Sequence, residues 1–308
     1  AICDELRRWL EVACTYPQFS NSGIGSRTVG VNSLSNNGVP FPSATTTVSD
    51  NQFIFHAMVA DFGASSTLGT GGPFFTFRTN VAGSATIFAM RIRLDDSIDA
   101  NPNTELSRDV IRHEIGHAFS LGTLWGTDTE LPVRTNNGET LYLGPLPGGN
   151  TASSAAFAQY TAIYSAASST GMPNTNGIPT ETGAGHWQQA HFQFTDDQAL
   201  MCPSRNRKGR LSKITVGALE DAGFTVDFAL ADQFDGEVSR RRRRDVDEAA
   251  ADATIGPAAP FCAGGTAVAM FATDATADEV REQLNGMVRA HGPPPSHVHF
   301  VLPWLPAR

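Results

Sequence analysis

The stretch RHEIGHAFSLGTLW, residues 112–125, contains the pattern His-Glu-x-x-His. On an α-helix, His113 and His117 lie one turn apart on the same face, so both imidazoles can reach one metal ion. Glu114 lies beside the first histidine, within reach of a water molecule bound to that ion, where it can act as a general base. The pattern therefore predicts one catalytic zinc ion, with His113 and His117 as ligands and Glu114 as the base.

The sequence before this motif predicts a helix from about Glu105 to Ser120. Asn101 and Thr104 are typical helix caps, and an acidic residue follows them in the first turn. Apolar residues at helical spacing share one face with the two histidines. Gly122 suits the left-handed conformation that often ends a helix.

A zinc site of this kind needs a third protein ligand and one open position. The chain has eight histidines, and the next one after His117 is His186. His186 and His191 both lie in GAGHWQQAHF, residues 183–192, and both are candidates for the third ligand. His56 lies in an apolar strand pattern, where a hydrogen-bonded core histidine is expected. A predicted strand at 297–302 carries two more histidines, for which we do not favour a metal role.

Four blocks of sequence occur in a characteristic order. They are HEIGHAFSLGTLW (113–125), IPTETGAGHW (178–187), QALMCP (198–203) and KITVGALEDAGFTVD (213–227). Together they resemble the leishmanolysin-like branch of the metzincin metalloproteases, over about residues 72–228. In that family a long insertion separates the zinc helix from the third histidine, and a Met-turn follows it. The order of the blocks is far more specific than the five-residue motif alone.

This resemblance implies a role for individual residues. His113, His117 and His186 look like the zinc ligands. His186 is preferred as the third ligand because GxGHW matches the family block. His191, whose surroundings do not match that block, remains the rival candidate. Met201 looks like the Met-turn residue, which forms an apolar floor beneath the metal without binding it.

The resemblance also implies the fold. The expected class is α+β and metzincin-like: an N-terminal twisted sheet with the zinc-binding helix, and a C-terminal subdomain that carries His186 and the Met-turn. By the same resemblance, the strand at 84–94 is expected to be the sheet edge along which an extended substrate lies.

The sequence departs from the family pattern at two places. Ser120 stands where a glycine usually follows the second histidine, and a serine would be strained there if it needed a positive φ. Gly122 is the alternative position for that turn. In addition, the residues after the Met-turn are Cys202, Pro203 and Ser204. No tyrosine is therefore available from that position to stabilise a transition state.

The chain is expected to divide into five parts. Residues 69–75 (GTGGPFF) are interpreted as a turn or loop between strands at 52–60 and 84–94, and 126–185 as mostly loop with one helix at about 153–167. Two further helices are expected at 5–12 and at about 213–222. The run Arg240 to Arg244, followed by acidic residues, indicates a charged linker. The predicted parts are a catalytic subdomain with the zinc helix (1–125), an inserted segment (126–185), a second catalytic subdomain (186–234), a linker (235–256) and a C-terminal tail or small module (257–308).

Composition limits the classes of protein. The 308 residues are 41% hydrophobic and 17% charged, which is typical of globular domains. The formal charge of −9 argues against nucleic acid as a partner. No window is long and apolar enough for a transmembrane helix. The four cysteines leave open either buried thiols or disulfides, with Cys3 and Cys14 as the local pair.

These observations predict a zinc-dependent metalloendopeptidase that acts on peptide or protein substrates. The resemblance implies an extracellular or cell-surface location and leaves open an association with a membrane. The alternative function is a surface adhesion or binding module that contains zinc but does not cleave. Glu114 argues against that alternative, because a structural zinc site has no need of that carboxylate. The sequence predicts no oligomeric state.

Overall fold

The computed structural model contains helices and strands in most of the regions where the sequence predicts them. The described residues are 1–15, 27–30, 45–48, 52–63, 67–78, 85–100, 104–126, 131–136, 138–145, 151–166, 176–192, 197–204, 207–232, 266–270 and 297–303. The arginine run 240–244, Cys262 and the side chains of Cys3 and Cys14 lie outside what is described. The predictions for the linker and for a Cys3–Cys14 disulfide therefore stay predictions.

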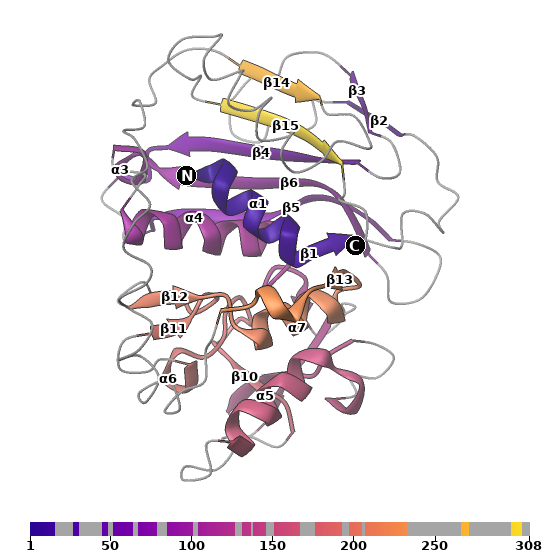
Figure 1. Ribbon diagram of the computed structural model, residues 1–308, viewed down its shortest axis with the longest axis vertical. Coiled ribbons are helices and arrows are strands. Elements are labelled where there is room, and N and C mark those ends of the chain that lie inside the picture. The colour runs from indigo at the N-terminus through magenta and orange to yellow at the C-terminus, as the bar shows by residue number, and fades with distance from the viewer. Residues whose placement is uncertain are drawn as a thin grey trace.

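A five-stranded sheet forms the upper layer of the molecule in Figure 1. Its strand order is β14-β15-β4-β6-β5. Strand β4 runs parallel to β6, while β5 is antiparallel to β6 and β15 is antiparallel to β4. Segment 257–308 thus contributes two strands to the N-terminal sheet. The five strands are β4 (Gln52–Ala60), β5 (Gly69–Arg78), β6 (Ala85–Asp95), β14 (Thr266–Met270) and β15 (His297–Pro303).

The edge of this sheet is not the predicted strand. Strand β6 lies between β4 and β5, so the prediction that residues 84–94 form the edge is wrong. The edge strand next to β6 is β5, which includes the stretch 69–75 that was predicted to be a turn or loop. Its glycines suggest a turn in sequence, but here they allow a helix to pack closely. A Cβ on Gly71 would overlap the carbonyl oxygen of Glu114.

Helix α4 (Glu105–Ala118) packs against the sheet and carries the His-Glu-x-x-His motif. The predicted start is confirmed, because the Thr104 hydroxyl accepts a hydrogen bond from the Ser107 N–H at 3.1 Å. The helix ends two residues before the predicted Ser120. Its residues from Asp109 to Ala118 are all buried, so its position is fixed by contacts on every side.

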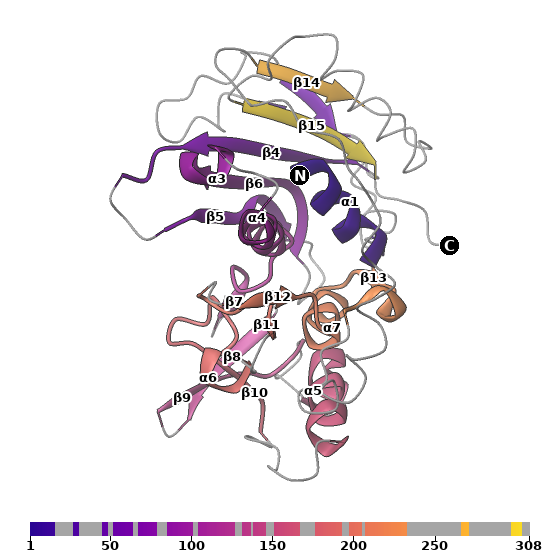
Figure 2. The ribbon, with the colours of Figure 1, turned by 60° about the vertical axis from the view of Figure 1, so that its left-hand side comes forward.

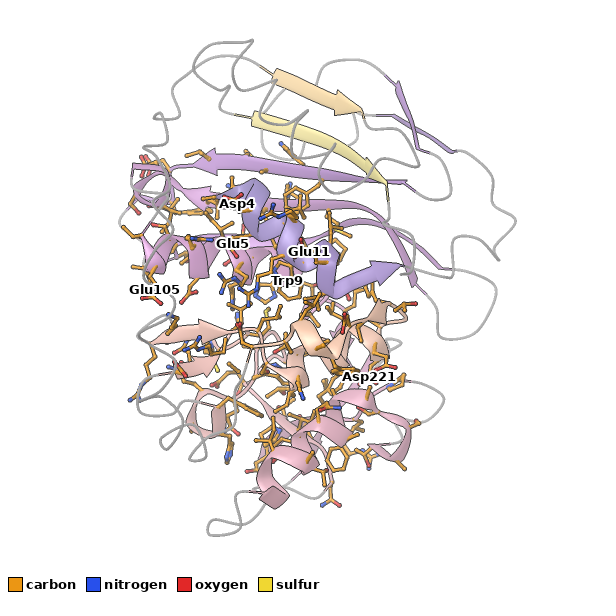
Figure 3. All side chains as sticks on the ribbon, in the orientation of Figure 1. Asp4, Glu5, Trp9, Glu11, Glu105 and Asp221 are labelled. Atoms are coloured by element: carbon orange, nitrogen blue, oxygen red, sulfur yellow. The ribbon has the colours of Figure 1, made fainter. Side chains whose placement is uncertain are left out.

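Helix α1 (Ile2–Val12) packs on α4 and begins three residues before the predicted start at Glu5. The Trp9 indole N–H donates to the Arg112 carbonyl at 2.9 Å. Figure 3 labels Trp9 and Glu5 on α1. Glu5 is only 1% exposed and accepts from Arg112 Nε at 2.6 Å and from Arg108 Nε at 2.9 Å. Burial acts to raise the pKa of Glu5, but the two arginines outweigh it and lower that pKa.

The N-terminal segment also reaches the lower half of the molecule. Strand β1 (Ala13–Thr15) pairs antiparallel with β13 (Thr225–Val226), and the Asp227 N–H donates to the Val12 carbonyl at 2.9 Å. Arg8 forms an ion pair with Asp232. Figure 2 shows α1 above β13 and α7, so residues 1–15 connect the two halves.

The segment 126–185 contains more strand than predicted. Its helix α5 (Ala155–Ala166) is confirmed, and the described part also contains a four-stranded sheet of order β10-β9-β8-β7 that was not predicted. These strands are short and rich in turn-forming residues, so no period-2 pattern stands out. They are β7 (Trp125–Gly126), β8 (Leu131–Asn136), β9 (Glu139–Tyr142) and β10 (Ile178–Thr180).

The predicted helix at 213–222 is confirmed as α7 (Lys213–Asp221). Two strands before it, β11 (Asp197–Ala199) and β12 (Lys208–Arg210), pair in parallel. Among the described helices, none has the length and apolar character needed to cross a bilayer. The remaining elements are β2 (Arg27–Gly30), β3 (Thr45–Val48), α3 (Asp96–Ala100), α6 (Gln189–Phe192), and the 3-10 turns η2 (Thr151–Ser153) and η3 (Phe228–Leu230).

Asp221, at the end of α7, ties the inserted segment to the C-terminal part (Figure 3). Its carboxylate accepts hydrogen bonds from the Ser154 hydroxyl at 2.6 Å, the Ala155 N–H at 2.7 Å and the Tyr142 hydroxyl at 3.0 Å. The bond to the Ala155 N–H satisfies one of the otherwise unpaired donors at the start of α5.

Replacing this carboxylate should therefore destabilise the protein. We expect Asp221→Ala to lower the free energy of unfolding by about 2–4 kcal/mol, because it removes a helix cap and leaves hydroxyl donors without their acceptor. Urea unfolding followed by fluorescence measures the change. The exposed neighbour provides a control, since Glu220→Ala should change stability by less than about 0.5 kcal/mol. Equal stability of the two variants would contradict the role given to Asp221.

Candidate metal centre

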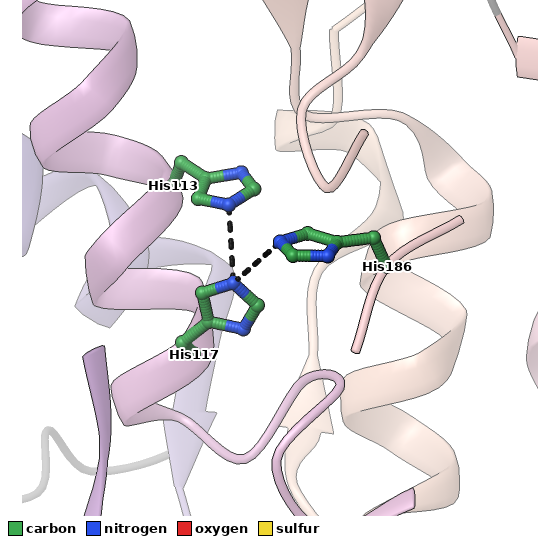
Figure 4. A group of neighbouring side chains, drawn as sticks. All are labelled: His113, His117 and His186. Carbon is green, nitrogen blue, oxygen red and sulfur yellow. Dashed lines mark hydrogen bonds between the residues drawn. The ribbon is translucent and has the colours of Figure 1, made fainter. Parts of the chain in front are cut away.

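Three histidines from two distant parts of the chain meet beside α4 (Figure 4). Nε2 of His117 lies 3.0 Å from Nε2 of His113 and 3.1 Å from Nε2 of His186. The candidate ligand atoms of all three lie within 4.8 Å of one another. Two nitrogens bound tetrahedrally to one zinc ion at about 2.0–2.1 Å would be about 3.3 Å apart. The two distances that involve His117 therefore lie within a few tenths of an ångström of this value, and no pair of candidate ligand atoms is more than 4.8 Å apart.

The other ring nitrogens orient the imidazoles. Nδ1 of His113 lies 2.7 Å from the Leu200 carbonyl, and Nδ1 of His117 lies 2.7 Å from the Leu121 carbonyl. A carbonyl can only accept, so each Nδ1 carries the proton and each Nε2 presents a lone pair.

Two of the three histidines, His117 and His186, are also held in the form that binds metal. Burial lowers the pKa of His117 to about 4, with a further contribution from the charge of His186. Burial likewise lowers the pKa of His186 to about 4. Both rings are therefore neutral near pH 7, as metal ligation requires.

The loop that carries His186 is fixed on both sides. The His186 carbonyl accepts from the Glu181 N–H at 2.9 Å, and the Trp187 N–H donates to the Met201 carbonyl at 3.0 Å. The fully buried Trp187 ring donates to the Thr215 hydroxyl at 3.2 Å. The structure thus brings His186 next to His113 and His117, whereas His191 lies in α6 outside the three-histidine group.

Met201 packs against the middle of the motif helix. A Cβ on Gly116, which lies between the two histidines of α4, would be 2.6 Å from the Met201 sulfur. The chain turns sharply here, with a hydrogen bond of 3.1 Å from the Cys202 N–H to the Ala199 carbonyl. Met201 is fully buried and Cys202 is a buried thiol. The methionine therefore supplies an apolar contact to the helix that carries the histidines.

The chain leaves α4 through two residues with positive φ. Ser120 has φ +82°, which is the strained conformation anticipated for a serine here, and Gly122 has φ +74°. The Ser120 hydroxyl is buried and has no hydrogen-bond partner among the described residues. Gly122 therefore does not take over the positive φ from Ser120, because both residues adopt it. Gly122 is also constrained by the backbone that lies against it. A Cβ on Gly122 would overlap the carbonyl of Gly185, next to His186.

A cavity of about 600 Å³ opens onto the three histidines. Its walls are the start of β5, helix α4, the His186 loop and the residues after Met201. Glu114 lines it, and Oε2 of this carboxylate is buried without a hydrogen-bond partner in the described part of the chain. Burial raises the pKa of Glu114 to about 8. A nearby cation would favour the ionised form, so this carboxylate suits a site that holds a metal ion.

His56 of strand β4 lies outside the three-histidine group. His56 is buried in β4, as expected for a core residue, and its register partner on β15 is His299. Because the side chain of His299 is not among those that the structure describes, the expectation that it does not bind metal stays a prediction. The sequence interpretation missed Gly69 and Gly71, which lie against Glu114. Their signal was present, because glycines at alternate positions are expected where a strand approaches another backbone closely.

Comparison with protein-family models finds no match for this chain, and comparison with curated proteins finds none either. The relationship to leishmanolysin-like metalloproteases therefore rests on the four sequence blocks and is a proposal.

The third ligand can be identified by metal analysis of two variants. We expect His186→Ala to weaken zinc binding by more than about 100-fold, which is the upper range for loss of a residue that only supports a ligand. His191→Ala should retain one zinc ion per chain. Elemental analysis after dialysis, followed by competition with a chelator, provides the measurement. Full zinc content in the His186 variant would exclude it as a ligand.

The strain at Ser120 gives a second prediction. Ser120→Gly should raise the free energy of unfolding by about 1–2 kcal/mol, because it removes a strained backbone conformation and an unpartnered hydroxyl. Gly122→Ala should instead destabilise the protein, since its Cβ would overlap Gly185. Chemical denaturation of both variants tests the pair. A destabilised Ser120→Gly variant would show that the serine makes a favourable contact there.

Proposed function

We propose that this chain is a zinc-dependent endopeptidase of the leishmanolysin-like branch of metzincins. The observation that carries the proposal is one cleft that contains three converging imidazoles and a buried carboxylate, Glu114, whose Oε2 has no hydrogen-bond partner among the described residues. Burying a carboxylate oxygen without a partner lowers stability, and groups of this kind are concentrated at functional sites. The proposed substrates are peptides or proteins, and the resemblance adds an extracellular or cell-surface location.

His113, His117 and His186 would hold one zinc ion. A zinc ion bound by three histidines would act as a Lewis acid, and it would lower the pKa of a water molecule in its fourth coordination position. The backbone carbonyls on Nδ1 of His113 and His117 keep these rings oriented throughout the reaction.

Glu114 would move the protons. Its carboxylate takes a proton from the attacking water and then delivers it to the nitrogen of the leaving amine, so that it returns to its starting state. Oε2 is free to do this because no described side chain or backbone group occupies it. Burial excludes competing solvent from the carboxylate.

The outer edge of β5, with which none of the described strands pairs, offers a place for the substrate main chain. The Leu68 carbonyl accepts from the Asp95 N–H at 2.9 Å, so residue 68 directs its polar groups toward β6. In an antiparallel pair the direction alternates, and Gly69 and Gly71 therefore direct their N–H and C=O groups outward. Pro73, at the next outward position, has no N–H. An extended peptide would pair with residues 69–71 by strand addition.

The cleft walls favour uncharged side chains near the scissile bond. Leu68, Val110 and Pro203 contribute apolar surface, while threonine and serine residues add hydroxyls. Apart from Glu114 and the three histidines, none of the described residues that line the cleft has an ionisable side chain. A charged substrate side chain placed here would lose solvation without gaining a partner.

Replacement of the proposed base separates a protease from a zinc-containing binding module. We expect Glu114→Gln to lower kcat by about 10²–10⁴-fold, the usual contribution of a general base, while zinc content stays at the parent level. The measurement uses a quenched fluorescent peptide library and elemental analysis, with Glu220→Gln as the exposed control. Unchanged proteolysis in the Glu114 variant would contradict the mechanism. A parent protein that binds zinc but cleaves no peptide would favour the adhesion or binding module.

A further inference from the structure

The glycines of β5 lie at very short range from the proposed base. A Cβ on Gly69 would be 2.6 Å from Cγ of Glu114 and 3.0 Å from its Oε1. A Cβ on Gly71 would overlap the Glu114 backbone carbonyl. The neighbouring Gly72 differs, because a Cβ there would make an ordinary contact of 3.6 Å with the Thr123 methyl group. Two glycines of the same strand thus contact one residue in different ways.

The contact at Gly69 cannot be relieved by the backbone of either element. Residue 69 is fixed by pairing with Leu94 of β6, and residue 68 by its hydrogen bond to Asp95. Glu114 lies in the middle of α4, whose backbone is already pressed against Gly71. Cγ of Glu114 is near the root of its side chain, so only rotation about χ1 can move it away. Because side chains occupy discrete staggered rotamers, such a rotation moves the carboxylate by ångströms.

We propose that Gly69 is a positioning residue that keeps the Glu114 carboxylate in the cleft. The absence of a Cβ at residue 69 leaves the space that the Glu114 side chain fills. This inference rests on the proposed peptidase function, in which Glu114 is the base. Gly71 has the distinct task of letting the backbone of α4 approach the sheet.

This arrangement couples two parts of the proposed reaction. The backbone groups of Gly69 face the outer edge of β5, where the substrate main chain would pair, while its α-carbon borders Glu114. One residue therefore sets the spacing between the bound peptide and the base. In a reaction that depends on placement, an error of about 1 Å can cost about 100-fold in rate.

The first test compares Gly69→Ala with Gly72→Ala in the full zinc-loaded chain. Gly69→Ala is expected to lower kcat by about 10–100-fold, with KM within about threefold and one zinc ion retained. Gly72→Ala, on the same strand but without the contact to Glu114, should keep the parent kcat. A crystal structure of Gly69→Ala should show the Glu114 side chain in a different χ1 rotamer. An unchanged rotamer would overturn the proposal.

A second test uses unfolding and needs no activity. Urea midpoints are measured for the parent, Gly69→Ala, Glu114→Ala and the double variant. Since Glu114→Ala removes Cγ, Gly69→Ala should lower the midpoint of the parent but not that of the Glu114→Ala protein. If the Gly69→Ala variant does not fold, the double variant should fold. An equal loss in both backgrounds would show that residue 69 does not act through Glu114.

The outcomes separate this inference from the proposed function. A parent that cleaves peptides, with a Gly69→Ala variant of equal kcat, overturns only the role of Gly69. A parent that cleaves nothing overturns the peptidase proposal and with it the catalytic meaning of the contact. In that case the urea midpoints of the parent, the two single variants and the double variant still decide whether Gly69 holds the Glu114 side chain in place.

Discussion

The approach of His186 to the motif helix is the constraint on which the rest of the structure depends. Its Nε2 lies 3.1 Å from that of His117, although the two residues are 69 positions apart. The turn at Gly122 touches the backbone at Gly185, and the Met201 carbonyl holds Trp187. A four-stranded sheet and α5 fill the intervening sequence. These elements fix where the chain returns to the site.

The two buried glutamates at helix α4, Glu5 and Glu114, differ in whether both carboxylate oxygens have hydrogen-bond partners among the described residues. Glu5 is almost fully buried, and two arginines satisfy it, so it joins α1 to the back of the helix. Glu114 is also buried, but its Oε2 has no partner among the described residues, and its pKa is raised. Folding alone gives no reason to keep an unpaired carboxylate in a cavity. The proposed role of Glu114 as general base explains this difference between the two glutamates.

Edge strand β5 illustrates where pattern analysis fails. GTGGPFF resembles a turn because glycine and proline usually mark one. In the folded chain the same residues are a strand, because Gly69 and Gly71 allow α4 to pack at a distance that no side chain permits. The choice of the next strand, residues 84–94, as the edge failed for a related reason. Apolar alternation indicates a half-buried strand but contains no information about its neighbours.

Local sequence by itself determined the motif helix, its Thr104 cap, α5, α7 and strand β4, because capping and periodicity are properties of neighbouring residues. It also nominated His113, Glu114, His117 and His186, and it marked Ser120 as a strained position. Only the tertiary structure decided which strand forms the edge, that segment 126–185 contains a sheet, and that the imidazoles of His113, His117 and His186 converge while His191 lies apart. Those features depend on contacts between residues far apart in the chain, and these contacts leave no periodic signal in the sequence.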